Sequence, residues 1–406
     1  MIKRFVTIFF ILIAFPCFSR EIIIGVINDG PHHYSLHYNH SIKRQKSYVI
    51  KIIKSDLKRK FKHDILTFKY IDYDDSNFFA AAKAIKKQIT SIRPHIIFGP
   101  YSYKVLHYLK DTIRNSKIPF VSQISYSSLR NLKNFYTPFE WNDVALKLNI
   151  NKAKELMDKK KPKIGAFVQI NDDLSVDAYE SAKRYLKNDL FVIKLVHSQS
   201  KKYWQYEYKL DDDIKNMIKY SPDIILNPNS QDINQISFDL SLKMTNQGFN
   251  GIFIDSESWP CSRYLIETYK EKFSKTKAQS IGISAAQLKC PQDWEQDEKK
   301  FRMEILQNEE QYYPSSGLFY KTLKHVLNSI LESHLPISSS NIQKIIQKNS
   351  FFKGFSNEKF NLYKTKDSPE FLNIYKYYFE KNFRIENLTS LNLYQKQDSN
   401  KESSDK

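Results

Sequence analysis

Glycine and cysteine are scarce in this chain of 406 residues, and so are the catalytic motifs that depend on them. Only nine glycines are present, and none forms a Gly-x-Gly-x-x-Gly fingerprint, a phosphate-binding P-loop or a Gly-x-Ser-x-Gly turn. A His-Glu-x-x-His zinc motif is also missing. The sequence therefore predicts a protein that is not an enzyme and that uses no cofactor.

Long apolar runs are missing too, apart from one near the amino terminus. Lys3 and Arg4 precede the run 5–15, which is short for a membrane span but typical of a secretory signal peptide. We expect residues 1–19 to be this signal peptide, with cleavage after Ser19. The mature chain would then be soluble and either periplasmic or secreted.

Cleavage would leave two of the three cysteines, Cys261 and Cys290. An even pair in an oxidising compartment usually forms a disulfide. Both cysteines follow predicted neighbouring strands, at 251–255 and 280–285, so we expect them to reach each other.

Acidic residues are outnumbered by basic ones, which gives a net charge of +19. The lysines are spread along the whole chain, and no recognised nucleic-acid module accompanies them. We therefore expect no nucleic-acid partner.

Strand and helix patterns alternate along the chain, which is typical of doubly wound parallel sheets. The strands predicted from short buried runs are 21–27, 66–71, 95–98, 118–121, 163–169, 190–196, 223–227, 251–255 and 280–285. Amphipathic helices are predicted between them, including 48–61, 77–92 and 143–158. The pattern begins again after about residue 160, so the fold class is α/β with two Rossmann-like lobes.

Hydroxyl side chains follow two successive strands of the first lobe. Ser102 comes after the strand 95–98, and Ser122, Ser125 and Tyr126 come after the strand 118–121. Ligands of open parallel sheets bind outside the carboxyl ends of the strands, where helix starts also offer amide groups. These hydroxyls are ligand candidates, although serine is also frequent at such turns as a helix cap.

Two further groups could carry chemistry. Asp255 ends the strand 251–255 and Glu257 follows it, where they could face a ligand amine or serve as a helix cap and a solvated acid. Four histidines crowd the loop His32–His40, and His33, His37 and His40 have spacings that would suit a transition metal on a helix.

Several segments in this order resemble the type I periplasmic binding proteins, in particular the branch of the branched-chain amino acid receptors of ABC importers. The resemblance runs from about Glu21 to Phe383 and is carried by IIFGPYSY, IPFVSQISYSS, KIGAFVQINDD, SPDIILNP, GFNGIFIDSESW, FYKTLKHVLNSIL and FFKGFSNEKFNLY. It implies two lobes joined by a three-strand hinge. Lobe 1 would hold 21–137 plus 295–336, lobe 2 would hold 138–294 plus 337–385, and 386–406 would be a disordered polar tail.

The resemblance also assigns site residues. It implies that Ser102, Ser125 and Tyr126 face a ligand carboxylate, and that Asp255 or Glu257 faces a ligand ammonium group. The remaining candidates lie in or beside the matching loops and are Tyr34, Tyr101, Ser122 and Asn171. Family members that bind amino acids commonly have Tyr-Gly where this chain has Leu174-Ser175, so the ligand stays open.

The sequence and the resemblance together predict an exported, monomeric solute-binding protein. It would close two lobes over a small polar ligand, such as an amino acid, and deliver it to an ABC transporter permease or another inner-membrane partner or sensor. One alternative is an interaction module of the same fold without transport, comparable to the periplasmic activators of cell-wall synthases. Another is a metal-binding protein that uses the His32–His40 loop.

Overall fold

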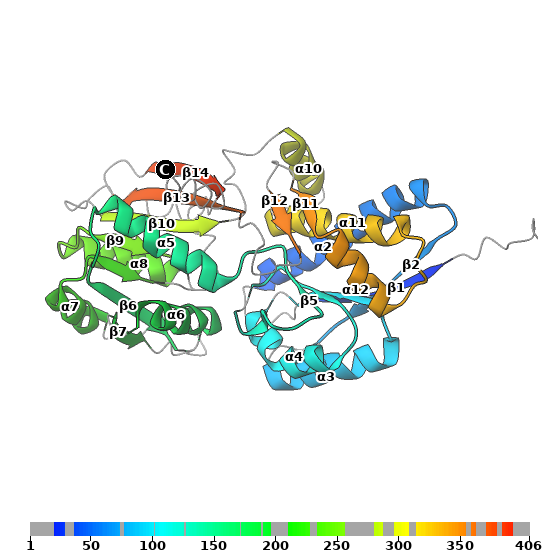
Figure 1. Ribbon diagram of the computed structural model, residues 1–406, viewed down its shortest axis with the longest axis horizontal. Coiled ribbons are helices and arrows are strands. Elements are labelled where there is room, and N and C mark those ends of the chain that lie inside the picture. Colours follow the sequence, from blue (N-terminus) through cyan, green and yellow to red (C-terminus); the bar gives the residue numbers. More distant parts are fainter. Residues whose placement is uncertain are drawn as a thin grey trace, which may run out of the picture. The chain divides into compact units, whose positions relative to one another are not determined.

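The computed structural model divides into two compact units (Figure 1). It describes residues 20–28, 36–73, 77–100, 102–125, 127–170, 172–187, 190–195, 210–227, 234–255, 280–286, 296–307, 314–354, 359–362, 371–379 and 384–392. Unit 1 comprises 1–123, 133–136 and 304–352, and unit 2 comprises 124–132, 137–303 and 353–406. Apart from the short excursion 124–132, the chain passes between the units three times.

Unit 1 is built on a parallel sheet with strand order β2-β1-β3-β4-β5. Its strands are β1 (Glu21–Ile27), β2 (Ile65–Ile71), β3 (Ile96–Phe98), β4 (Phe120–Val121) and β5 (Phe135–Tyr136). Its helices are α2 (Leu36–Lys60), α3 (Phe78–Ile92), α4 (Tyr103–Asn115), α11 (Pro314–Glu332) and α12 (Ser339–Lys348). In Figure 1, α3 and α4 lie on one side of this sheet, and α2 and α11 lie on the other.

The core of unit 1 follows from runs of apolar residues in its central strands. Ile22, Ile24 and Val26 of β1 are fully buried, because helices cover both faces of a parallel sheet. α3 turns Ala81, Ile85 and other apolar positions inward at helical spacing.

Unit 2 contains a sheet of order β14-β13-β10-β9-β8-β6-β7, in which the last two strands of the chain are antiparallel. Its strands are β6 (Ile164–Gln169), β7 (Leu190–Leu195), β8 (Ile224–Leu226), β9 (Ile252–Ile254), β10 (Ser280–Ala286), β13 (Phe371–Phe379) and β14 (Arg384–Asn392). Its helices are α5 (Asn142–Leu156), α6 (Asp173–Leu186), α7 (Leu210–Tyr220) and α8 (Asn234–Asn246), with the short 3-10 helix η1 (Ser127–Leu129). The predicted α/β class with two doubly wound parallel-sheet lobes is confirmed.

Two apolar clusters cover the two faces of the unit 2 sheet. One joins Phe167 and Phe253 to Met217 of α7 and Met244 of α8. The other joins alternate strand residues to α5 and α6, as at Ile150 and Ala182. Successive strand side chains point to opposite faces, so each strand contributes to both clusters.

Three elements lie at or near the boundaries that divide the units. They are α10 (Gln296–Leu306), β11 (Phe351–Lys353) and β12 (Lys359–Asn361), and the last two form a separate two-stranded sheet. None of the helices in the described residues is both long and apolar enough to span a bilayer.

Three expectations from the sequence need correction. The helix expected at 48–61 is longer and begins at Leu36. Its first turns carry mostly polar residues, and even the buried Gln45 and Lys46 are polar, so no apolar periodicity marks its start. The segment 386–406 is not disordered throughout, since 386–392 belong to β14, which supplies backbone partners to the edge of β13.

The third correction concerns α12, which the expected lobe boundary at 336 would place in lobe 2. It belongs to unit 1, because Ser339 donates a hydrogen bond to His95 O at 3.1 Å and Gln343 donates one to Lys117 O at 2.7 Å. The boundaries by contact are 303/304 and 352/353 instead of 294/295 and 336/337.

Candidate functional site

The strand order of unit 1 reverses between β1 and β3, which makes the carboxyl ends of these two strands the topological switch point. Ligands of open α/β sheets bind in the crevice at such a point. Asn28 directly follows β1, and Ser102 follows β3 after a short turn. These two residues are therefore the first to consider in unit 1.

Asn28 is held in place by its neighbours at the end of β2. Its Nδ2 donates to Asp72 Oδ1 at 2.9 Å, and Lys43 Nζ donates to the same oxygen at 2.9 Å. Burial alone would raise the pKa of Asp72, but these two hydrogen bonds outweigh it and hold the pKa below its usual value. Asn28 Oδ1 is buried without a hydrogen-bond donor among the described residues.

The turn after β3 depends on Gly99. Its φ is +99°, and a Cβ at this position would lie 2.9 Å from Ile27 O, so the turn needs glycine both for its backbone angle and for its closeness to β1. The turn leads to Ser102, whose Oγ accepts a hydrogen bond from Val105 N at 3.3 Å and caps α4. The capping contact uses only the oxygen, and within the described residues the Ser102 hydroxyl hydrogen has no acceptor.

Ser122 differs from Ser102. Its Oγ donates to Pro100 O at 2.6 Å, and its side chain is buried. The hydroxyl therefore supports the turn after β3 from inside unit 1.

The corresponding switch point of unit 2 lies between β6 and β8. Gln169 ends β6, Asn227 follows β8, and Asp255 follows β9. All three are buried, and strand alternation places them on the face of the sheet that carries Phe167 and Phe253. Asn227 and Asp255 are adjacent, because Asn227 N donates to Ile254 O at 2.8 Å.

Gln169 has the least satisfied polar side chain at this edge. It is fully buried, and neither Oε1 nor Nε2 has a hydrogen-bond partner among the described residues. Its backbone N, by contrast, donates to Ser175 Oγ at 3.0 Å, and Ser175 N donates to the α6 cap Asp172 at 3.2 Å. The backbone is thus fixed while the amide group of the side chain lacks a partner.

Leu174 and Ser175, which replace the Tyr-Gly expected from the resemblance, lie inside unit 2. Leu174 is 8% exposed and Ser175 is fully buried. These two side chains support the start of α6, and they offer no aromatic ring to a ligand.

Ser125 belongs by its contacts to unit 2, not to the unit that holds Ser102 and Ser122. Its Oγ donates to Asn142 Oδ1 at 3.1 Å, and Asn142 Nδ2 donates to Asp177 Oδ2 at 3.3 Å. The same Asp177 oxygen accepts from Ser127 N at 3.2 Å and from Ser127 Oγ at 2.8 Å. This Asp177 cluster of four residues ties the excursion 124–132 to α5 and α6.

Burial raises the pKa of Asp177 above its ordinary value. The hydrogen bonds from Ser127 and Asn142 oppose this rise, whereas the nearby carboxylate of Asp143 adds to it. Asp177 is thus a buried acid whose charged form is stabilised only in part by its partners.

The other predicted site residues lie outside the residues that the structure describes. They are Tyr34, Tyr101, Tyr126, Asn171, Glu257, Cys261 and Cys290, together with His32 and His33. The disulfide between Cys261 and Cys290 stays a prediction.

The metal prediction also rests on residues that are only partly described. His37 and His40 lie in α2 instead of a loop, so their backbone is helical, but their side chains are outside the description and the metal site stays a prediction. Among the described residues, no group of three or more His, Cys, Asp or Glu side chains is arranged to hold a metal ion.

Comparison with known proteins yields no matching family model and no matching curated protein. Solved structures do match. A leucine-binding protein from Thermotoga maritima aligns with a TM-score of 0.64 and 14% identity over 93% of this chain and 100% of that one. The chain thus has the fold of the type I periplasmic binding proteins.

Two further structures extend this likeness. A branched-chain amino acid transporter substrate-binding protein from Streptococcus pneumoniae, solved with isoleucine, aligns with a TM-score of 0.61 and 12% identity over 91% of this chain and 98% of that one. A fatty acid ABC transporter substrate-binding protein from Thermomonospora curvata aligns with a TM-score of 0.62 and 13% identity over 93% and 94%. The fold therefore accompanies ligands of different chemistry.

Proposed function

We propose that this chain is a solute-binding protein whose small polar ligand contacts the switch points of both units. The observation that carries the proposal is a buried side-chain amide at the end of the first strand of each unit, Asn28 and Gln169, with polar atoms that lack described partners. An unpaired buried amide costs about 1–3 kcal/mol, so a ligand that supplies the partner missing among the described residues would gain this free energy.

The available groups favour a ligand that carries both hydrogen-bond donors and acceptors. In unit 1, the Ser102 hydroxyl and the first amides of α4 suit a carboxylate. In unit 2, Gln169 supplies one donor group and one acceptor, and Asp255 supplies a carboxylate. A zwitterion such as an amino acid carries a carboxylate for the groups of unit 1 and an ammonium group for those of unit 2.

The ligand would act by stabilising a closed arrangement of the two lobes, because it gains contacts that the open arrangement lacks. The closed form would then be presented to an ABC permease or another membrane partner. The likeness in fold to transporter substrate-binding proteins supports this role.

The first experiment identifies the ligand. Natively purified protein is denatured, and released small molecules are identified by mass spectrometry, alongside a thermal-shift screen of amino acids, peptides, sugars and metal ions. We expect a polar solute that is released and that raises the melting temperature. Finding neither would refute the receptor function and favour the interaction module.

Variants then test the switch points. Gln169→Leu should abolish ligand-induced stabilisation, whereas Gln247→Leu, at an exposed glutamine of the same unit, should keep it. Ser102→Ala is paired with Ser338→Ala, because Ser338 caps α12 by the same contact, with its Oγ accepting from Asn341 N at 3.2 Å. Equal ligand binding in both serine variants would show that Ser102 acts only as a cap.

A further inference from the structure

The outer face of α3 and α4 exposes two large aromatic rings. Phe79 is 66% exposed and Tyr108 is 49% exposed. The two rings meet edge to face across the helices, with centroids 6.2 Å apart. Helical spacing places Phe79, Lys83 and Lys86 on one stripe of α3, beside Tyr108 on α4, and Arg93 follows the helix as its C-cap.

This part of the chain is also strongly basic. Residues 77–117 contain eight lysines and arginines but a single acidic residue, whereas the whole chain has 63 basic and 44 acidic residues. The one acid, Asp111, already accepts a hydrogen bond from Arg114 at 2.6 Å. Within the described residues, Lys83, Lys86 and Lys87 form no ion pair, so their charges are free to act on a partner.

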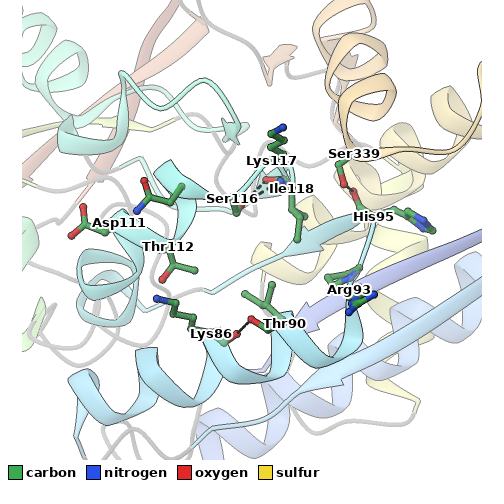
Figure 2. Close-up of a pocket in the computed structure, with 13 residues that line it drawn as sticks. Lys86, Thr90, Arg93, His95, Asp111, Thr112, Ser116, Lys117, Ile118 and Ser339 are labelled. Atoms are coloured by element: carbon green, nitrogen blue, oxygen red, sulfur yellow. Dashed lines mark hydrogen bonds between the residues drawn. The ribbon is translucent and has the colours of Figure 1, made fainter.

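Between the two helices the surface is hollowed into a groove of about 570 Å³ (Figure 2). Lys86 of α3, its C-cap Arg93 and Lys117, which follows α4, contribute cationic groups to it, and Asp111 of α4 contributes a carboxylate that is paired with Arg114. Ile89, Pro94 and Ile118 contribute apolar surface. Cationic groups beside an apolar lining match an anionic amphiphile.

We propose that the α3–α4 face, defined by Phe79, Lys83, Lys86, Arg93 and Tyr108, docks the protein on an anionic phospholipid bilayer. Lysines near such a surface are attracted to its headgroups, and exposed aromatic rings insert at the boundary between headgroups and acyl chains. The groove would seat one anionic headgroup. The groove lies in unit 1 away from the switch point, because it is at the carboxyl ends of α3 and α4, at the opposite edge of the sheet from Ser102. Phe79, at the start of α3, lies at the same edge as Ser102.

A membrane suits this face better than an acidic protein does. Its three cations, Lys83, Lys86 and Arg93, end flexible stems and form no ion pair within the described part of the chain, which suits a fluid array of headgroups. Its aromatic rings stand at the surface and not in a pocket, so they would insert into a soft medium.

The test is co-sedimentation with phosphatidylcholine vesicles, prepared with and without phosphatidylglycerol. The chain from Arg20 onward is used, because it includes every described residue and lacks the apolar run 5–15, which would itself insert into lipid. We expect binding only to the anionic vesicles and weaker binding as salt is raised. Failure to bind anionic vesicles overturns the proposal.

Matched variants separate the face from the overall charge. The double variant Lys83→Glu and Lys86→Glu should weaken binding by at least roughly thirtyfold, since each lysine adds to the attraction. Lys160→Glu with Lys161→Glu makes the same change of net charge on exposed residues of unit 2 and should leave binding nearly unchanged. Equal losses in the two double variants would show that net charge alone binds the vesicles, which overturns the proposal.

Two more arms complete the test. Phe79→Ser should weaken binding by roughly fivefold through loss of ring insertion, while circular dichroism shows an unchanged fold. Soluble polyglutamate serves as the competing acidic polypeptide. If the face binds polyglutamate but not anionic vesicles, its partner is an acidic protein and the membrane proposal is wrong.

Discussion

Replacing Arg20 by alanine should destabilise unit 1, because one guanidinium joins three separate parts of it. Its Nε and Nη2 donate to the two carboxylate oxygens of Asp64, each at 2.9 Å. The same group donates to Leu331 O at 2.8 Å and to Ser333 O at 2.6 Å, at the end of α11. Arg20 thus connects the starts of β1 and β2 to the carboxyl end of α11.

The size of the effect follows from how far the pair is buried. The Arg20 and Asp64 side chains are 27% and 12% exposed. A fully exposed pair contributes about 0–1 kcal/mol, whereas breaking a buried one costs about 3–5 kcal/mol. For this partly buried and forked pair we expect Arg20→Ala to lower the free energy of unfolding by about 2–3 kcal/mol.

Urea unfolding can assign this loss to unit 1. All four tryptophans, at 141, 204, 259 and 294, belong to unit 2, so their fluorescence reports on that unit, while far-UV circular dichroism reports on both. We expect the dichroism midpoint to fall. A simultaneous fall of the fluorescence midpoint would mean that the two units unfold together.

Two variants control the interpretation. Arg20→Lys keeps the charge but cannot form the fork, so it should recover less than half of the loss. Arg59→Ala removes an arginine of the same unit whose side chain is 78% exposed and whose Nη2 lies 3.6 Å from Asp56 Oδ1. If Arg20→Ala costs no more than Arg59→Ala, the clamp does not stabilise the unit and the reasoning above is refuted.

Three further predictions test the turn, the amide and the buried acid. Gly99→Ala should cost about 1–3 kcal/mol in urea unfolding because of its φ of +99° and the contact with Ile27 O; a cost near zero would contradict the described turn. Gln169→Met should raise the free energy of unfolding of the ligand-free protein in urea by about 1 kcal/mol, while removing ligand-induced stabilisation; a lower free energy of unfolding would mean that the amide has a partner. The pKa of Asp177 is raised in the folded state, so its contribution to stability is fully present below the unfolded pKa of about 3.9 and is lost as the pH rises through the folded pKa. The wild type should therefore lose stability relative to Asp177→Asn between these two pKa values. Parallel pH profiles of the urea midpoint for the two proteins would contradict this.

The fold could be predicted because buried strands and amphipathic helices leave strong periodic patterns. The apolar runs at β1, β3 and β6 and the helical spacing of α3 each identify their element without reference to the rest of the chain. The start of α2 could not be predicted in this way. Its buried Gln45 accepts a hydrogen bond from Ser316, which lies 271 positions away, so no local pattern reveals that it is inside.

The candidate site was predictable only in part, for a related reason. Ser102 and Asp255 stand out in sequence as polar residues after apolar strands, and the same signal is present at Asn28, Gln169 and Asn227. What no local signal could show is where a hydroxyl is directed. Ser125 donates to Asn142, 17 positions along the chain, and that residue donates to Asp177, a further 35 positions along.

The interleaving of the two units bears on how the chain can acquire its structure during synthesis. Unit 1 takes α11 and α12 from 304–352, so its first 123 residues lack two of their covering helices until most of the chain exists. The sheet of unit 2 is completed at one edge by β13 and β14, the last strands described. A ribosome adds residues in order, so the apolar strands of unit 1 stay partly exposed until the helices that cover them have been synthesised. Such a chain has a long interval in which a chaperone can keep it unfolded, and a truncation near residue 300 would leave both units incomplete.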